Sequence, residues 1–331
     1  MRFFPPEWQK HSRTWVAFPT AGYTLGETES DHEKARKTWA SVANAASEFE
    51  AVSVVVNPGD EQIAKRYLSS ACDILPIPIN DAWIRDSGPS FVIEDKQLKA
   101  VNWIFNGWGA QGWAQFDKDA QLATAIANHL GVEVIDSELV NEGGGFHVGP
   151  KGELLLTKTV QLGKGRNPDL SASAVEREMH DKLGTNKAIW LERGLTRDYE
   201  EFGTQGHVDI VACFAPDGRV LIHDQRNPNH PDYLVSAEVR ELFIRAGFET
   251  ISVPAPDVLS DGEGPVDFSY INHYVLNNAV LLCAFNDPRD KEAKAIIREA
   301  YPGREIILLD ATELFARGGG IHCITQQQPE V

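Results

Sequence analysis

The sequence predicts a single α/β domain, residues 1–331, in which five similar units form a closed ring, as in a five-bladed α/β propeller. Three observations support this fold class. A hairpin, a helix and a strand follow one another four times at a spacing of roughly 60 residues, which is typical of repeat architectures. The segments left at the two termini supply the parts of a fifth unit. A run of three glycines followed by an apolar residue and a histidine also occurs twice, at 143–147 and 318–322.

The first complete unit is predicted between residues 90 and 135. Residues 90–94 and 98–105 alternate in polarity like two strands around a short polar turn. Residues 117–130 have the apolar spacing of a helix, and 132–135 is a short apolar strand. The alternative of an open doubly wound sheet is disfavoured, because a hairpin pairs its strands antiparallel and such sheets are mostly parallel.

Three further units repeat this order of two hairpin strands, one helix and one strand. Their predicted elements are 146–148, 153–157, 171–183 and 188–191, then 207–214, 219–223, 236–246 and 249–253, then 269–276, 279–285, 291–300 and 305–309. Ser171 is a suitable N-cap for the first of these helices, because its hydroxyl can accept a bond from a free helix amide.

The fifth unit is split between the two ends of the chain. Residues 14–18 and 52–56 read as strands, and residues 29–49 between them as a helix. The missing hairpin partner is predicted at the C-terminal strand 321–325. Pairing of the N- and C-terminal strands would close the ring and remove exposed sheet edges.

The charge balance limits the classes of partner. The chain has 31 Lys plus Arg against 48 Asp plus Glu, a net charge of −17, and no basic cluster. Nucleic acid is therefore not expected as a partner, whereas a small cationic substrate would be attracted. The acidic surface could equally serve only solubility. No apolar run approaches the ~20 residues that span a membrane, and the first residues lack the apolar core of a signal peptide, which predicts a cytoplasmic protein.

The four cysteines differ in their surroundings. Cys72, Cys213, Cys283 and Cys323 lie far apart without a Cys-x-x-Cys pair, so neither a disulfide framework nor a zinc site is expected. Cys213 and Cys283 lie in apolar, strand-like runs. Cys323 instead follows a glycine run and a histidine, which makes it the candidate nucleophile. No metal or other cofactor is expected, since no further motif completes a ligand set or a dinucleotide fingerprint.

If the units are equivalent, the loops that enter their hairpins meet at one end of a central channel. These loops carry Asp86, Glu142, His207, Asp209 and Cys323. A thiol, an imidazole and a carboxylate are the groups of nucleophilic catalysis, in which the thiol attacks and the imidazole transfers protons. Two further carboxylates suit a guanidinium, whose five donors have fixed directions.

Aromatic residues and glycines surround these positions in the sequence. Trp83 and Trp108 could simply be core residues, but Trp108 lies between two glycines, which suits a pocket wall that holds a cation or an alkyl chain. The glycine runs, Gly320 included, can take positive φ and let the backbone approach a ligand closely. Asp198, Glu200 and Glu201 could be solvated or could meet the distal end of a substrate.

An ordered set of motifs resembles the agmatine deiminases of the guanidine-modifying pentein superfamily. The motifs are Pro-Glu-Trp at 6–8, Asp-Ala-Trp-Ile-Arg-Asp-Ser-Gly-Pro at 81–89, Phe-Asn-Gly-Trp-Gly at 105–109, and the segments 142–147, 165–168, 206–209 and 318–327. They cover nearly the whole chain. The resemblance implies a five-bladed α/β propeller, cofactor-free hydrolysis of agmatine to N-carbamoylputrescine and ammonia, and often a homo-oligomer.

The resemblance also implies a role for each candidate residue. Cys323 would be the nucleophile that forms a covalent thiouronium intermediate, and His207 the general acid and base. Asp86 and Asp209 would bind the guanidinium, and Glu142 would be the partner of His207. Trp83, Trp108 and Gly320 would contact the substrate.

Two other functions remain open at this point. The segment 193–206 is longer than the family pattern and ends differently, so the substrate could be arginine, peptidyl-arginine or another alkylguanidine. An arginine substrate would need a cationic receptor for its carboxylate, such as Arg85, Arg193 or Arg197. A catalytically silent guanidinium-binding module is disfavoured, because a pure binder has no use for a nucleophilic thiol.

Overall fold

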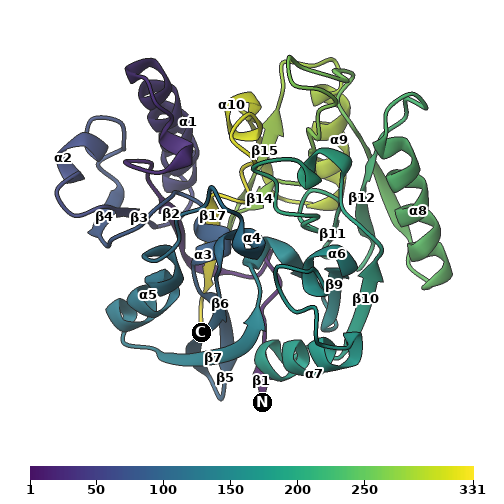
Figure 1. Cartoon of the computed structure of the whole chain (residues 1–331), viewed down its shortest axis with the longest axis horizontal. Helices are drawn as coiled ribbons and strands as arrows, with labels where there is room; N and C mark the ends of the chain where they lie inside the picture. The colour runs from purple at the N-terminus through teal and green to yellow at the C-terminus, as the bar shows by residue number, and fades with distance from the viewer.

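The computed structural model describes residues 1–331. It contains five small β-sheets of three or four strands, and the long helices lie at the periphery of the molecule (Figure 1). Every sheet combines an antiparallel strand pair with a parallel pair. This is the pairing that a repeated hairpin, helix and strand produces, so the predicted mixed α/β class is confirmed.

The first sheet shows how one unit is built. β5 (Ser90–Glu94) and β6 (Gln97–Ile104) form the predicted hairpin, and β7 (Glu133–Val140) runs parallel to β6. The crossover helix α5 (Leu122–Leu130) ends at Gly131, whose φ of 67° is left-handed. The predicted start of this helix at 117 is wrong, because a short 3₁₀ helix, η2 (Asp119–Gln121), precedes α5.

Three further sheets repeat this unit. Their elements are β8 (Phe146–Val148), β9 (Glu153–Thr157), α7 (Ala172–Leu183) and β10 (Lys187–Leu191); β11 (Ala212–Phe214), β12 (Val220–Asp224), α8 (Asp232–Arg245) and β13 (Thr250–Pro254); β14 (Tyr274–Val275), β15 (Ala279–Ala284), α9 (Asp290–Ala300) and β16 (Glu305–Asp310). The N-cap role of Ser171 is confirmed, since its hydroxyl accepts a bond from the Ala174 amide.

Two predicted strands begin later than expected. Residues 207–211 form a turn, in which the amides of Val211 and Ala212 both donate to the Val208 carbonyl, so β11 starts only at Ala212. Residues 269–273 are likewise not a strand, and β14 starts at Tyr274. The backbone bends there because these segments direct buried polar side chains into the interior instead of alternating between two faces.

The last sheet joins the two ends of the chain. It contains β17 (Thr325–Pro329), β2 (His11–Ala17), β3 (Val52–Val56) and β4 (Cys72–Pro76), with α1 (Glu29–Ser47) between β2 and β3. β17 pairs antiparallel with β2, as predicted, but the predicted strand 321–325 is wrong: the Thr325 amide closes a turn onto the His322 carbonyl before β17 begins. β4 and β1 (Arg2–Phe3), which pairs with β5, were not predicted.

Short helices occupy several of the connecting loops. They are η1 (Tyr23–Leu25), α2 (Glu61–Ala64), α3 (Ile84–Ser87), α4 (Gly107–Ala110), η3 (Gly143–Gly145), α6 (Lys158–Gln161), η4 (Thr196–Tyr199) and α10 (Thr312–Phe315). Three of them, α3, α4 and η3, carry candidate site residues or their neighbours.

The core extends through the chain from end to end. One cluster of 67 buried apolar residues runs from Trp15 to Ile324, and a smaller cluster of 12 includes Phe4, Phe146 and Met179. None of the helices has both the length and the apolar composition needed to cross a membrane.

Candidate active site

Asp86 is fixed by two donors on its two oxygens. It lies in α3 and is buried. Its Oδ1 accepts a bond of 2.9 Å from the Gly144 amide, and its Oδ2 accepts one of 2.9 Å from the Trp108 indole nitrogen. Burial raises the pKa of Asp86, and the neighbouring His207 opposes that shift. The carboxylate therefore has a defined position next to an imidazole.

Asp209 keeps one oxygen free. Its Oδ2 lies 2.9 Å from His322 Nδ1, whereas the buried Oδ1 has no hydrogen-bond partner. The other ring nitrogen of His322 lies 2.9 Å from Glu7 Oε1, so a buried chain of Glu7, His322 and Asp209 forms beneath the site. Burial raises the pKa of Asp209, but His322, His207 and Arg85 together outweigh burial, and the net pKa is lowered. One oxygen of an ionised carboxylate is thus free to accept a donor.

His207 lies between two carboxylates. Its Nε2 is 3.5 Å from Glu142 Oε2, and its Nδ1, which has no hydrogen-bond partner, is 3.9 Å from Asp86 Oδ1. Burial lowers the pKa of His207, but Asp86, Glu142 and Asp209 together raise it to about 9. The imidazole is therefore protonated at neutral pH.

Arg166 holds Glu142 in place. Its Nε donates to both carboxylate oxygens of Glu142, at 3.0 and 2.9 Å, and a terminal nitrogen donates to the Thr204 carbonyl. Burial raises the pKa of Glu142, but Arg166 and His207 lower it further than burial raises it. Glu142 is consequently an ionised partner of His207 with a fixed orientation.

Cys323 contacts both an acid and an amide. Its buried Sγ lies 3.5 Å from Asp209 Oδ2, and Asn272 Nδ2 donates to it at 3.3 Å. Burial raises the pKa of the thiol well above its ordinary value, and the charges of Asp209 and Asp86 raise it further. The protonated thiol is therefore the stable form beside these carboxylates.

The glycine runs matter mainly because they lack side chains. A Cβ at Gly144 would come within 2.5 Å of His207 Nδ1, 3.0 Å of Asp86 Oδ1 and 3.1 Å of Asp209 Oδ2. A Cβ at Gly319 would lie 3.0 Å from Cys323 Sγ. Among the six glycines only Gly318 has positive φ, at 104°, so the predicted need for positive φ is wrong for the other five. Close packing of the site accounts for them.

Trp83 and Trp108, the two aromatic residues predicted to contact the substrate, lie in different parts of the site. Trp83 packs edge-on against Trp39, with ring centroids 5.4 Å apart. A Cβ at Gly319 would contact the Trp83 ring as well as the Cys323 thiol, so Trp83 lies close to the sulfur. Trp108 bonds to Asp86 and stacks on Trp113, with ring centroids 5.4 Å apart. Gly320 packs against Asn272, whose side chain would clash with a Cβ there, and its contact with substrate stays a prediction.

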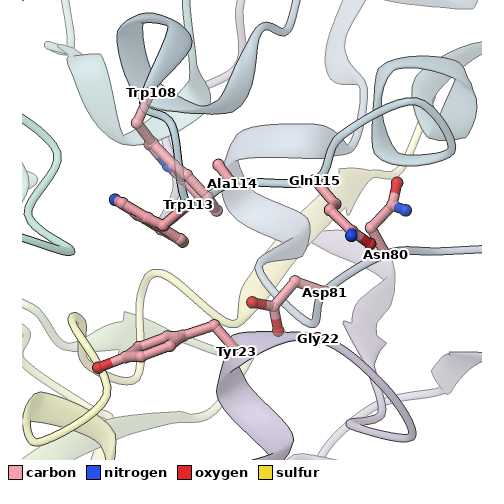
Figure 2. Close-up of a pocket in the computed structure, with 8 residues that line it drawn as sticks. All are labelled: Gly22, Tyr23, Asn80, Asp81, Trp108, Trp113, Ala114 and Gln115. Atoms are coloured by element: carbon pink, nitrogen blue, oxygen red, sulfur yellow. The ribbon is translucent and has the colours of Figure 1, made fainter.

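A pocket of about 330 Å³ opens beside Trp108. Its lining is formed by Gly22, Tyr23, Asn80, Asp81, Trp108, Trp113, Ala114 and Gln115, which Figure 2 shows as sticks. Three aromatic rings and one carboxylate therefore face a single space next to the guanidinium candidates Asp86 and Asp209.

The structure brings all five predicted residues together, but the sequence analysis missed three supporting residues. Asn272 lies in a segment predicted as a strand. Glu7 and Arg166 belong to motifs of the family resemblance, at 6–8 and 165–168, without an assigned role. The signal that could have identified Arg166 was the buried Glu142, which needs a cationic partner.

Comparison with known proteins gives a consistent result. Residues 3–329 match the model of the Porphyromonas-type peptidyl-arginine deiminase family. A Streptomyces coelicolor protein that carries the provisional name agmatine deiminase is 50% identical, over 98% of both chains. The agmatine deiminase of Stutzerimonas stutzeri is 32% identical, over 99% of this chain and 95% of its own. The solved agmatine deiminase of Enterococcus faecalis superposes with a TM-score of 0.91 at 29% identity, over 99% of this chain and 96% of its own.

The chain belongs to the agmatine deiminase family.

In this member of the agmatine deiminase family, Asp198 organises the segment 193–206, which precedes His207. Of the two alternatives for Asp198, solvation is wrong, because the residue is buried. Its carboxylate accepts bonds from the amides of Thr204, Gly206 and His207, at 2.6, 2.7 and 2.9 Å. Asp198 therefore fixes the backbone that carries His207, whereas its neighbours Glu200 and Glu201 are exposed.

Proposed function

We propose that the protein is a cofactor-free hydrolase that converts agmatine to N-carbamoylputrescine and ammonia. The observation that carries this proposal is the free, buried Oδ1 of Asp209 beside Asp86 and the Cys323 thiol. A planar guanidinium has donors for both carboxylates at once. Bound there, it would place its central carbon next to the sulfur.

Binding of the guanidinium would also generate the nucleophile. Burial and the charges of Asp209 and Asp86 hold the Cys323 thiol in its protonated form. A bound guanidinium would bring a positive charge next to the sulfur and offset these carboxylates. Substrate binding would therefore lower the pKa of Cys323, and the thiol proton would be lost to solvent.

The proposed reaction has two stages. The Cys323 thiolate forms a bond to the guanidinium carbon, and the C–N bond of one terminal nitrogen then breaks as His207 donates a proton to the leaving ammonia. The resulting thiouronium is attacked by water, which gives its proton to His207. The C–S bond breaks as the remaining hydroxyl proton of the adduct is lost to solvent, and the neutral ureido product leaves with the thiolate restored. Glu142 orients His207 throughout, and Arg166 orients Glu142.

The three arginines considered as carboxylate receptors are all engaged, which favours agmatine over arginine. Arg85 is buried and donates to Gln326 and Gln327. Arg193 pairs with Glu238, and Arg197 pairs with Asp261 and Glu263. A free carboxylate on the substrate would have to displace these partners from Arg193 or Arg197, or reach Nη2 of the buried Arg85, its one terminal nitrogen without a hydrogen-bond partner.

We also propose that the five sheets form one closed, five-bladed propeller and a single domain. The hydrogen-bonded pairing of β17 with β2 supports closure, because it joins the two ends of the chain in one sheet. The apolar cluster that spans the chain from Trp15 to Ile324 supports one domain.

Ammonia release from agmatine, free arginine and a C-terminal arginyl peptide tests the proposed reaction. Agmatine should be preferred, and Cys323→Ser should lower kcat by at least about 10⁴-fold, as loss of a catalytic nucleophile does in other enzymes. The variant should keep the wild-type melting temperature. Preference for arginine would overturn the substrate, and turnover by Cys323→Ser at a rate near wild type would overturn the mechanism.

A further inference from the structure

Glu7 and His322 meet beneath the active site, although the proposed reaction uses neither. Glu7 belongs to the motif at 6–8 near the N-terminus, and His322 directly precedes Cys323. Both side chains are buried, and His322 Nε2 lies 2.9 Å from Glu7 Oε1. Burial of two charged groups costs free energy and does not by itself stabilise a fold. A buried pair at this position therefore points to a role in the site above it.

Both ring nitrogens of His322 face carboxylate oxygens. On the side opposite to Glu7, Nδ1 lies 2.9 Å from Asp209 Oδ2. Ionised carboxylates only accept hydrogen bonds, so both ring nitrogens carry protons. Burial lowers the pKa of His322, and Arg85 lowers it further, but Glu7 and Asp209 together raise it above its ordinary value. The ring is therefore a cation that is held in one orientation from two sides.

His322 is the cation that Asp209 contacts directly. The titratable groups that face His322 are Glu7 of the N-terminal segment, Asp209 of the turn at 207–211, Arg85 of α3, His147 of β8 and His273 before β14. The two histidines are neutral, because burial lowers the pKa of each to about 4. Arg85 forms its salt bridge with Glu7, at 3.6 Å, and none with Asp209.

The two guanidinium carboxylates of the site differ in this respect. Asp86 has its nearest histidine nitrogen, that of His207, at 3.9 Å, and burial raises its pKa. Asp209 faces Asp86, His207 and the Cys323 thiol in addition to His322. Its pKa is nevertheless lowered, and His322 is the largest of the influences that oppose burial. The bond from His322 also occupies Oδ2, which leaves Oδ1 for the substrate.

We propose that His322 is a positioning residue for the reaction. Through Nδ1 it keeps Asp209 ionised with one oxygen free for the guanidinium, and Glu7 keeps the ring charged and oriented through Nε2. The N-terminal segment thus takes part in the site without touching the substrate. This inference rests on the proposed deiminase function and adds two residues that set the charge of one of its carboxylates.

The test measures agmatine binding by calorimetry as a function of pH. The Cys323→Ala protein, which cannot turn the substrate over, is compared with the same protein carrying His322→Asn. Asparagine keeps an amide donor close to the place of Nδ1 but has no charge. Without the cation the pKa of Asp209 rises, so the loss of affinity on acidification should begin about 1 pH unit higher. An unchanged pH dependence would overturn the proposal, because a structural role alone would not shift it.

His223→Asn in the same Cys323→Ala protein is the matched control. His223 and His322 are both 3% exposed, and His223 Nδ1 also has a hydrogen-bond partner, Ser269 Oγ at 3.2 Å. Burial lowers the pKa of His223 to about 4, so its ring is neutral and the substitution removes no charge. The pH dependence of agmatine binding should stay as it is without this substitution. An equal shift in both variants would assign the effect to packing and overturn the proposal.

Glu7→Gln tests the other end of the chain of contacts and does not depend on the folding of His322→Asn. Nitrogen NMR of isotope-labelled histidine should show that His322 loses a proton at a pH about 1 unit lower than in wild type. Glu153→Gln removes a carboxylate of similar burial, 8% exposed against 7% for Glu7, and should leave this titration unchanged. An unchanged titration in Glu7→Gln would overturn the role of Glu7. A wild type that releases no ammonia from agmatine would instead refute the deiminase function, and the NMR titration would still test the contact between Glu7 and His322.

Discussion

Gly144 shows at the scale of one residue why the glycine runs occur. Three side chains of the site, those of His207, Asp86 and Asp209, surround the position where its Cβ would lie. The Gly144 amide also donates to Asp86, so the backbone itself is part of the arrangement. Any side chain at this position must separate groups that have to meet around one guanidinium.

We expect Gly144→Ala to lower kcat/KM for agmatine at least about 100-fold, because misplacement of reacting groups by about 1 Å has that effect. Gly112→Ala is the matched control, since nothing lies within 4 Å of a Cβ there and its φ is not positive. Activity assays and melting temperatures of both variants check the prediction. Equal activity of the two variants would show that the close approach at Gly144 is unimportant.

The raised pKa of His207 predicts how stability depends on pH. A pKa raised from the ordinary 6.5 to about 9 means that the folded protein binds this proton more tightly than the unfolded chain. The contribution of His207 to stability is therefore fully present below about pH 6.5 and is lost as the pH rises towards about 9. Thermal unfolding of wild type and His207→Gln should show this extra loss between pH 6.5 and 9 in wild type only. Parallel curves would contradict it.

The segment 198–206 is the element that positions His207. Phe202 and Gln205 have positive φ, at 73° and 71°, although neither is glycine. Such backbone costs of the order of 1–3 kcal/mol per residue and persists only where the surroundings enforce it. Asp198 supplies that enforcement through its bonds to the amides of the same segment.

We expect Asp198→Asn to lower kcat/KM about 30-fold or more and to increase hydrogen exchange of the amides at 204–207, because an amide side chain accepts fewer bonds than a carboxylate. Glu200→Gln, two residues away and exposed, should change neither quantity. If hydrogen exchange rose without loss of activity, Asp198 would order the segment without positioning His207.

At the same scale, the sequence predicts the elements better than the loops. Long periodic segments such as α1 and the hairpin of β5 and β6 are visible because their apolar spacing repeats. β4 includes Asp73 and ends at Pro76, which has no amide to donate, so its sequence does not have the pattern of a strand. Residues 269–273 were predicted as the start of the strand that follows, yet they form a turn in which Asn272 donates to Cys323 Sγ.

In the candidate site, likewise, the reactive residues are easier to predict than the contacts that support them. Reactive types such as Cys323 and His207 stand out in the sequence, and the repeat places them together. The bond from Arg166 to Glu142 spans 24 residues and depends on how two loops pack. The burial of Asp198 is also invisible in composition, because main-chain amides of its own segment, not a charged residue, compensate its charge.

At the scale of the whole molecule, the two ends of the chain are joined in one sheet. β17 pairs with β2, and Gln326 and Gln327 within β17 accept bonds from the buried Arg85. The sheet that carries the chain termini thereby also supports α3, which contains Asp86.

We expect removal of residues 325–331 to abolish cooperative thermal unfolding, because it exposes an edge of β2 and removes the two glutamine acceptors of the buried Arg85. Removal of Val331 alone, which is 61% exposed, should leave the melting temperature unchanged. Calorimetry of the two truncated proteins checks this. A cooperative transition without β17 would show that closure of the sheet by the C-terminal strand is dispensable.

The protonated state of the Cys323 thiol also affects how long the protein survives. Peroxides and alkylating agents react with thiolates and hardly at all with thiols. Burial and the neighbouring carboxylates raise the pKa of the thiol, so we expect the sulfur of the free protein to resist oxidation. The carboxylates that make the resting sulfur a poor nucleophile would therefore also protect it from irreversible oxidation.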